Sequence, residues 1–297
     1  MLESSPMESL HLLLSVFLMG LLPVAPGGAS HSVTIDTLPL APPAIAAGKQ
    51  FPGRTLARSV SASGVVILDL RSGQEIFARN GGRRRSVGSL TKLMTAVIIA
   101  ESHELNEVVA VPADIARTDG STARLPPGSH FTVGDLLSAL LIASANDAAE
   151  TLARFHGGSD AAFVAEMNAR ARTLGLENTS FANPSGLDDA DQWSTPRDIA
   201  WLAAYALRNP AIRSRMSTVT ASIRSMEGRS IALEHTHELL GKGAVIAGKT
   251  GTTTAAKQCL FSLVNDGGRE YIVVLLGSSE RYVDLRTVLR VLTSFFA

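Results

Sequence analysis

A serine and a lysine three residues apart could together carry out acyl-transfer chemistry in this chain. The pair is Ser89 and Lys92, in the segment Ser89-Leu-Thr-Lys92, which begins a predicted helix. Side chains three residues apart on a helix lie on the same face, so the lysine can reach the serine hydroxyl. A serine becomes a good nucleophile when a neighbouring base takes its proton. Lysine can be that base only if burial or a second cation lowers its usual pKa of about 10.4.

The stretch from Gly243 to Thr253 (GAVIAGKTGTT) allows two interpretations. It fits G-x-x-x-x-G-K-[ST], the phosphate-binding loop of nucleotide enzymes. It also contains K-T-G, one of three elements of penicillin-interacting serine enzymes. A phosphate-binding loop requires a helix that begins at Lys-Thr, whereas Gly251-Thr-Thr-Thr254 is a poor helix start and leads toward another strand. The context therefore favours K-T-G.

The K-T-G interpretation predicts two companion motifs, and the chain contains both. Ser89 to Lys92 supplies S-x-x-K, and Ser144-Ala-Asn146 supplies S-x-N at a junction between two predicted helices. Each pattern is common by chance when taken alone. The three occur in the order S-x-x-K, S-x-N, K-T-G, each in the expected context, and together they indicate one catalytic site.

Four longer sequence segments elsewhere in the chain are typical of the same class of enzymes. They are Met167-Asn-Ala, Leu174-Gly-Leu-Glu-Asn-Thr179, Asn183-Pro-Ser-Gly-Leu187 and Ser194-Thr-Pro-Arg-Asp198. Residues 55–296, about four-fifths of the chain, thus resemble the D-alanyl-D-alanine carboxypeptidases and endopeptidases. These are serine DD-peptidases among the low-molecular-mass penicillin-binding proteins. The resemblance implies the α+β fold of serine β-lactamases and penicillin-binding proteins, in which helices flank an antiparallel sheet and a mostly helical subdomain lies beside it.

The resemblance also implies catalytic roles for three residues and a supporting role for a fourth. Ser89 would be the nucleophile and Lys92 its base. Ser144 would relay a proton to the leaving amine. Lys249 would be the second cation that lowers the pKa of Lys92.

Further residues are expected to bind the substrate. The resemblance implies that the Asn146 amide holds the substrate backbone and that Lys249 and Thr250 receive the terminal carboxylate. The backbone N–H groups of Ser89 and Thr252 would form the oxyanion hole. Gly251 would permit close approach of the substrate to the strand.

The hydrophobic patterns predict strands at both ends of the catalytic region and helices between them. Strands are expected at residues 64–70, 75–79, 259–264 and 269–277, and helices at residues 89–100, 133–143, 146–156, 159–175, from Ser194 onward, and at 283–296. Such an order implies one antiparallel sheet built from distant segments, with a helical insertion beside it.

The composition excludes several classes of protein. The chain has 297 residues, 45 % hydrophobic and 18 % charged, which predicts a folded core. Its 27 basic and 27 acidic residues balance, so no nucleic-acid partner is expected. The single cysteine, Cys259, excludes an intrachain disulfide and argues against a cysteine-based zinc site. We expect it to be a small buried side chain.

The N-terminal segment predicts export. Residues 10–22 (LHLLLSVFLMGLL) are nearly all apolar and are followed by small residues, which suits a signal peptide better than a membrane span. No basic residue precedes them, so an uncleaved anchor is the alternative. We expect a signal peptide at residues 1–29 with cleavage near Ala29, a linker at 30–54 and a DD-peptidase catalytic domain at 55–297. The mature protein would be periplasmic or otherwise extracytoplasmic, without a stable membrane span.

Two features depart from the family pattern. His235-Thr-His237 stands where relatives often carry Asn-x-Asn. No third metal ligand is evident, so we expect surface or cleft-rim histidines, no metal and no cofactor. Lys257 stands where the family frequently has glycine.

The leading hypothesis is a serine DD-peptidase that acts on peptidoglycan stem peptides and is inhibited by β-lactam antibiotics. Carboxypeptidase and endopeptidase activity remain open, although the chain's end soon after the catalytic domain favours the endopeptidase type. One alternative is a β-lactamase, but no E-x-x-L-N acid segment follows S-x-N. The other is a non-catalytic penicillin-sensing module.

Overall fold

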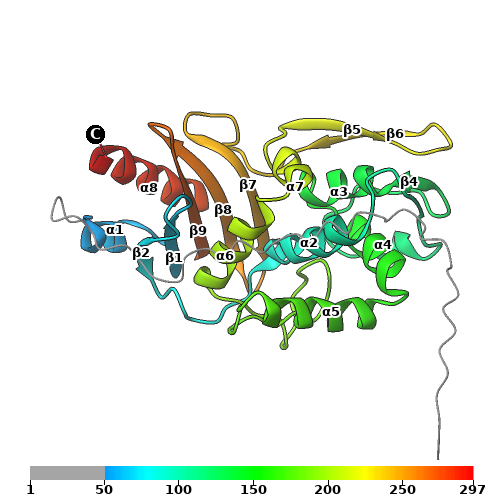
Figure 1. Cartoon of the computed structure of the whole chain (residues 1–297), viewed down its shortest axis with the longest axis horizontal. Coiled ribbons are helices and arrows are strands. Elements are labelled where there is room, and N and C mark those ends of the chain that lie inside the picture. The colour runs from blue at the N-terminus through cyan, green and yellow to red at the C-terminus, as the bar shows by residue number, and fades with distance from the viewer. Residues whose placement is uncertain (1–50, 297) are drawn as a thin grey trace, which may run out of the picture. The chain divides into compact units, whose positions relative to one another are not determined.

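A five-stranded antiparallel sheet, in the order β2-β1-β9-β8-β7, forms the centre of the structure (Figure 1). The computed structural model describes residues 51–296, so the predicted signal peptide and most of the predicted linker lie outside the described residues. The strands are β1 (Gly64–Asp69), β2 (Glu75–Arg79), β7 (Val245–Thr253), β8 (Lys257–Asp266) and β9 (Arg269–Ser278). Both predicted hairpins are confirmed.

The sheet joins the two ends of the described chain. β1 pairs with β9 over its whole length, from Gly64 opposite Leu276 to Asp69 opposite Tyr271. β8 lies between β9 and β7 and is antiparallel to both. All six residues of β1 are buried, because both faces of this strand are covered by helices.

One face of the sheet is covered by the first and last helices. Leu56 of α1 (Gly53–Ser59) and Leu285, Val288 and Leu292 of α8 (Arg281–Phe296) pack with sheet side chains in one apolar cluster. Helix α8 confirms the predicted terminal helix. Helix α1 was not predicted, because Leu56 is its only buried residue and so leaves no apolar period in the sequence.

The other face meets the helical region, whose centre is α2 (Figure 1). The 3-10 turn η1 (Gly88–Thr91) leads into α2 (Lys92–Ser102), and eight of the eleven α2 residues are buried. The remaining helical elements are η2 (Ile115–Arg117), α3 (Val133–Leu141), α4 (Asn146–Gly157), α5 (Asp160–Thr173), α6 (Pro196–Ala206) and α7 (Pro210–Met216). The predicted helices are thus confirmed, with the nucleophile candidate in a 3-10 turn.

Hydroxyl residues fix the starts of three of these helices. Thr132, Ser159 and Thr195 accept hydrogen bonds from backbone N–H groups in the first turns of α3, α5 and α6. Such caps satisfy donors that a helix start leaves unpaired. The helix boundaries around the site therefore follow from local sequence.

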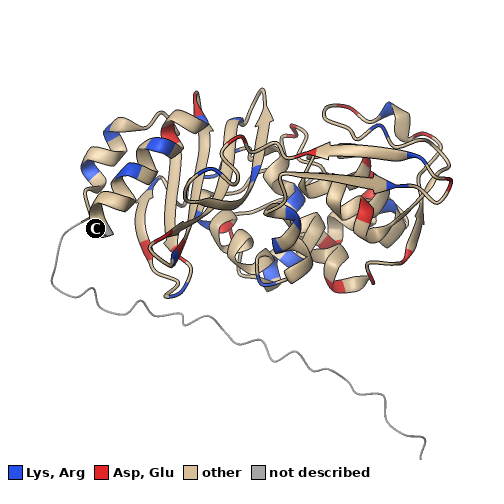
Figure 2. Ribbon diagram, turned by 90° about the horizontal axis from the view of Figure 1, so that it is seen from above, with Lys and Arg blue, Asp and Glu red and all other residues tan. Residues whose placement is uncertain are grey.

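Two small hairpins complete the described fold. They pair β3 (Val108–Ala110) with β4 (His130–Thr132) and β5 (Thr220–Arg224) with β6 (Ser230–Glu234). Neither was predicted, because each of these strands buries a single residue. Basic and acidic positions are interspersed over the described elements (Figure 2). Between residues 51 and 296, no helix combines the length and apolar character needed to cross a bilayer.

Candidate active site

The three sequence motifs meet where η1 packs against β7. The contact is backbone on backbone because glycine stands on both sides. A Cβ added to Gly251 would lie 2.9 Å from the Ser89 nitrogen, and one added to Gly88 would lie 3.3 Å from the Thr252 nitrogen. The two N–H groups expected to form an oxyanion hole therefore belong to adjoining segments. Gly251 serves this contact with η1, a role that the sequence did not indicate.

Lys92 is fully buried at the start of α2 and faces three oxygen atoms. Its Nζ lies 3.0 Å from Ser89 Oγ, 2.6 Å from Asn146 Oδ1 and 2.5 Å from the Ser185 carbonyl oxygen. The amide and carbonyl oxygens only accept hydrogen bonds. A neutral amine has two N–H groups and one lone pair, so those two acceptors take the hydrogens. The lone pair then faces the Ser89 hydroxyl.

The surroundings of Lys92 favour this neutral form. Burial lowers the pKa of Lys92 well below its ordinary value, and the charge of Lys249 lowers it further. Asp147 and Glu150 on α4 act in the opposite direction, but their effect is smaller. The predicted second cation is thus in place, and the predicted pairing of Ser89 with Lys92 is present in the geometry.

Ser144 and Asn146 reach the site from the junction of α3 and α4. Ser144 has a left-handed backbone, with φ of 59°, which turns its hydroxyl toward β7. Lys249 Nζ donates to Ser144 Oγ at 2.6 Å. Asn146 donates its amide N–H to the Asp119 carbonyl at 2.7 Å while its Oδ1 accepts from Lys92. Asn146 therefore orients the lysine here, and its contact with substrate stays a prediction.

Lys249 is fully buried in β7 and lies beneath the cleft. Besides Ser144 it donates to the Thr250 carbonyl at 3.0 Å. Burial, followed by repulsion from Arg281, lowers the pKa of Lys249 to about 7. Thr252 is exposed, and Thr250 donates to Thr236 Oγ1 at 2.6 Å. A carboxylate in the cleft would meet threonine hydroxyls before it met the Lys249 ammonium.

Arg281 is a site residue that sequence reasoning missed. It is the first residue of α8 and donates to the carbonyls of Gly251 and Cys259, each at 3.0 Å, and to Thr252 Oγ1 at 2.8 Å. It places a guanidinium beside the K-T-G strand, where an anionic substrate end can be attracted. No local motif marks it, because its position depends on how α8 docks on the sheet.

The loop between α5 and α6 closes the site from a third side. Gly186, with φ of 90°, crosses η1 so tightly that a Cβ there would lie 2.1 Å from the Gly88 carbonyl oxygen. Asn183 Oδ1 accepts from the N–H groups of Gly186 at 2.7 Å and Leu187 at 3.1 Å. This loop places the Ser185 carbonyl beside Lys92, and that is the structural role of the segment Asn183–Leu187.

Comparison with known proteins agrees with this geometry. Residues 52–280 match the sequence profile of the family described as D-alanyl-D-alanine carboxypeptidase. The chain belongs to the D-alanyl-D-alanine carboxypeptidase family. This confirms the resemblance on which the site was predicted.

Individual members of the D-alanyl-D-alanine carboxypeptidase family show the extent of the similarity. The chain is 33 % identical over 253 residues to the D-alanyl-D-alanine carboxypeptidase DacF of Bacillus subtilis, covering 83 % of this chain and 64 % of that protein. It is 29 % identical to a D-alanyl-D-alanine endopeptidase of Escherichia coli, covering 86 % and 84 % of the two chains. The crystal structure of the Streptomyces K15 DD-transpeptidase superposes with a TM-score of 0.74 at 27 % identity, over 80 % of this chain and 97 % of that one. The predicted α+β fold is confirmed.

The histidine segment differs from its predicted position. His235 and His237 are 7 % and 2 % exposed, so the expectation of surface or cleft-rim histidines is wrong for this pair. The His237 ring lies against β7 because Gly248 has no side chain, and its Nε2 is 2.8 Å from Ser262 Oγ. Burial lowers the pKa of His235 to about 3 and that of His237 to about 4, so both are neutral. Within residues 51–296, no cluster of three or more candidate ligands could hold a metal ion.

Two further sequence features acquire a physical explanation. Lys257 adopts φ of 56°, a left-handed conformation that glycine adopts without strain, which is consistent with the glycine that the resemblance led us to expect there. Cys259 is fully buried, and burial raises the pKa of its thiol to about 11. The prediction of a small buried cysteine is confirmed.

Proposed function

We propose that this protein is a serine DD-peptidase that cleaves D-Ala-containing peptidoglycan stem peptides through an acyl-enzyme on Ser89. The observation that carries the proposal is the arrangement around Lys92, which leaves an amine lone pair 3.0 Å from the Ser89 hydroxyl. Membership of the D-alanyl-D-alanine carboxypeptidase family supports the choice of substrate.

Acylation begins when neutral Lys92 takes the Ser89 proton as Oγ attacks the carbonyl carbon of the penultimate D-Ala. The negative charge that develops on the carbonyl oxygen is stabilised by the N–H groups of Ser89 and Thr252. The C–N bond then breaks. The leaving amine receives a proton from the Ser144 hydroxyl, which is hydrogen-bonded to Lys249. The proton that Lys92 took from Ser89 is passed back to restore Ser144, so both lysines end the step in their starting protonation states.

Deacylation reverses the proton movements with water as the nucleophile. Water loses a proton to the amine of Lys92, attacks the ester carbonyl, and Ser89 recovers its proton. The amine released in the preceding acylation step is free D-alanine in the carboxypeptidase reaction and the side-chain amine of a second stem peptide in the endopeptidase reaction. The same residues serve both reactions.

Purified muropeptides, with and without cross-links, test the proposal and identify the reaction. We expect mass spectrometry to detect loss of D-alanine, or separation of cross-linked dimers, with the unaltered enzyme and not with Ser89→Ala. Ser294→Ala on α8 is the matched control and should keep full activity. Product formation by Ser89→Ala, at the rate of the unaltered enzyme, would contradict the assignment.

We further propose that penicillin forms a long-lived adduct on Ser89. The site supplies an activated serine, but the sequence lacks the acid segment with which class A β-lactamases activate the deacylating water. Intact-protein mass spectrometry should detect an adduct that persists for many minutes. Rapid loss of the adduct with repeated penicillin turnover would instead favour the β-lactamase alternative.

The proposed location is outside the cytoplasm. It rests on the apolar run at residues 10–22 and the small residues before Ala29, which lie outside the described residues. N-terminal sequencing of the protein from a periplasmic fraction tests it. An intact N-terminus on a protein that only detergent extracts would favour an anchor.

A further inference from the structure

Among residues 51–296, the guanidinium of Arg281 has no carboxylate partner, since none of the ion pairs includes it. It donates instead to the carbonyls of Gly251 and Cys259 and to the Thr252 hydroxyl, all of which are uncharged. Its positive charge is therefore available to an anion that enters the cleft beside the K-T-G strand. How well it binds that anion depends on how firmly the guanidinium is held in place.

The ring of the next residue, Tyr282, lies against this guanidinium. The guanidinium carbon of Arg281 is 5.5 Å from the centre of the ring, within the range of an attraction between a cation and an aromatic face. Consecutive residues of a helix do not normally face each other. The contact therefore requires a tyrosine side chain that other parts of the chain hold in position.

Two hydrogen bonds hold the Tyr282 hydroxyl. It donates to the Thr236 carbonyl at 3.0 Å and accepts from the Glu238 N–H at 3.0 Å. The Tyr282 ring also meets the His237 ring edge to face, with 5.6 Å between the ring centres. Tyr282 is thus fixed both at its hydroxyl and along its ring, although the side chain is only partly buried.

Residues 236–238, which hold the tyrosine, are themselves attached to both walls of the cleft. The Thr236 N–H donates to the carbonyl of Ile142, just after α3, at 3.2 Å. The Thr236 hydroxyl accepts from Thr250 of the K-T-G strand at 2.6 Å. The aromatic ring that lies against the guanidinium is therefore anchored to the helical region and to β7.

We propose that Tyr282 is a positioning residue that holds the Arg281 guanidinium beside the K-T-G strand, where it selects a substrate that ends in a carboxylate. The ring restricts the rotation of a long side chain, so less conformational entropy is lost when an anion binds. The ring carries no charge, so it does not compete with that anion as a carboxylate partner would. This inference rests on the proposed DD-peptidase function and adds the residue that fixes the position of its charge-recognising group.

Two synthetic peptides measure how well the enzyme recognises the terminal charge. Acetyl-norleucyl-D-Ala-D-Ala ends in a carboxylate, and its carboxamide analogue ends in an uncharged group. We expect Tyr282→Leu to lower the ratio of kcat/KM for the carboxylate peptide to that for the carboxamide peptide by about three- to tenfold, the range of one contact between a cation and a ring. The carboxamide peptide should be cleaved as before. An unchanged ratio, or an equal loss with both peptides, would overturn the proposal.

Tyr205 on α6 supplies a matched control. Its ring lies against the guanidinium of Arg170 at the same distance of 5.5 Å, and its hydroxyl donates to Glu101 at 2.6 Å. Glu101 lies at the end of α2 opposite to Lys92. Tyr205→Leu therefore removes the same kind of contact away from the cleft, and the ratio should keep the value of the unaltered enzyme. A fall as large as that in Tyr282→Leu would show a general loosening of the fold and overturn the proposal.

A double-mutant cycle tests whether Tyr282 acts through Arg281. Arg281→Leu removes the charge itself and should lower the ratio at least as far as Tyr282→Leu does. The double variant should lower it no further than Arg281→Leu, because the effects of residues in contact are not additive. Tyr282→Phe, which keeps the ring and loses both hydrogen bonds, should cause a smaller loss than Tyr282→Leu. Losses that multiply in the double variant would show that Tyr282 acts independently of Arg281 and would overturn its positioning role.

Acylation by penicillin supplies a readout that does not depend on peptide hydrolysis. Benzylpenicillin carries a carboxylate, and its methyl ester does not. The free acid should acylate Ser89 faster than the ester, and Tyr282→Leu should reduce that advantage by a factor similar to that for the peptides. Failure of the unaltered enzyme to cleave either peptide would contradict the proposed function. An equal advantage of the free acid in Tyr282→Leu and in the unaltered protein would instead overturn the role of Tyr282.

Discussion

The two lysines of the cleft are both fully buried, yet they lie in opposite electrostatic surroundings. Lys92 on α2 has two carboxylates near it, Asp147 and Glu150, and both raise its pKa. Lys249 on β7 has a cation near it, Arg281, which lowers its pKa. The pKa of Lys92 is nevertheless lowered well below its ordinary value, because burial and the charge of Lys249 together outweigh the two carboxylates.

The comparison indicates that the two lysines have different roles in acylation. Two fixed acceptors occupy the hydrogens of neutral Lys92 and direct its lone pair to Ser89. Lys249 donates to the Ser144 hydroxyl and to the Thr250 carbonyl of its own strand, and not to the nucleophile Ser89. We infer that Lys92 moves the proton, whereas Lys249 supplies the charge that keeps Lys92 neutral.

The largest expected effect comes from removal of the proton acceptor. Lys92→Ala should slow acylation by a fluorescent penicillin by about 10²–10⁴-fold, the usual contribution of a general base. Stopped-flow fluorescence measures the rate, and circular dichroism checks the fold. Lys242→Ala, an exposed lysine near β7, is the matched control and should be unaffected. A loss of less than tenfold would show that a group other than Lys92 takes the Ser89 proton.

Removal of the tuning charge should have a smaller effect. Lys249→Met should slow acylation by about 10–100-fold, because each pKa unit that Lys92 regains is a factor of ten in the neutral form. Saturating substrate should not restore the rate. A defect in KM alone would show that Lys249 acts only in substrate binding and does not keep Lys92 neutral.

The pH dependence sharpens the same distinction. With a pKa of about 7, Lys249 loses its charge as the pH rises through that value, so acylation should decline on the alkaline side. Arg281→Leu removes a repulsive cation, raises the pKa of Lys249 and should move the declining limb to higher pH. If the acylation rate declines at the same alkaline pH in both Arg281→Leu and Lys249→Met, then deprotonation of Lys249 is not the cause of that decline.

The smallest expected effect is on the free energy of unfolding, through His235 and His237, the two neutral histidines that are buried near β7. Their folded pKa values of about 3 and 4 lie below the ordinary 6.5. As the pH falls below about 6.5, the unfolded chain takes up protons that the folded chain does not, so the free energy of unfolding falls until about pH 3.

Urea denaturation at about pH 7 and about pH 5 measures this loss. His237→Gln, which removes one of the two buried imidazoles, should reduce the difference between the two midpoints. Equal midpoint differences in His237→Gln and the unaltered protein would show that His237 is already protonated when folded.

The parts of the structure that local sequence determines could be predicted. Thr132, Ser159 and Thr195 mark helix starts because a hydroxyl caps N–H groups within three residues of it. The buried strands were visible as apolar runs between turn residues, and the S-x-x-K spacing follows directly from helical geometry. The catalytic serine and lysine were therefore accessible to prediction.

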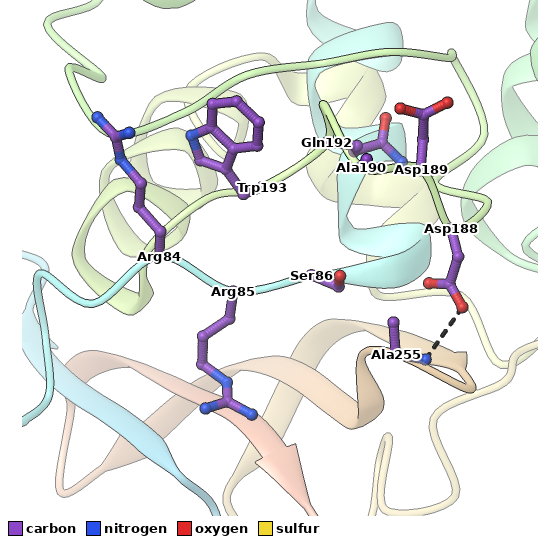
Figure 3. Close-up of a pocket in the computed structure, with 9 residues that line it drawn as sticks. All are labelled: Arg84, Arg85, Ser86, Asp188, Asp189, Ala190, Gln192, Trp193 and Ala255. Atoms are coloured by element: carbon purple, nitrogen blue, oxygen red, sulfur yellow. Dashed lines mark hydrogen bonds between the residues drawn. The ribbon is translucent and has the colours of Figure 1, made fainter.

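Features that depend on docking between distant elements could not be predicted. Arg281 reaches the K-T-G strand only because α8 begins at the edge of the sheet beside Thr252. His237 is buried because Gly248, eleven positions away, leaves room for its ring. The groove drawn in Figure 3 is lined by three segments that share no motif. In each case the residue types were visible, but their neighbours were set by tertiary packing.

The pairing of β1 with β9 has a consequence for the order in which the molecule is built. Strand partners about 200 residues apart must meet before the sheet closes. Such distant contacts form slowly compared with local ones, and a chain emerging from the ribosome lacks β9 until Arg269–Ser278 has been synthesised. The nucleophilic turn η1 rests on β7, which belongs to the same late group of strands. Catalytic competence is therefore acquired in one late step, and a nascent or C-terminally truncated chain carries Ser89 without the means to activate a substrate.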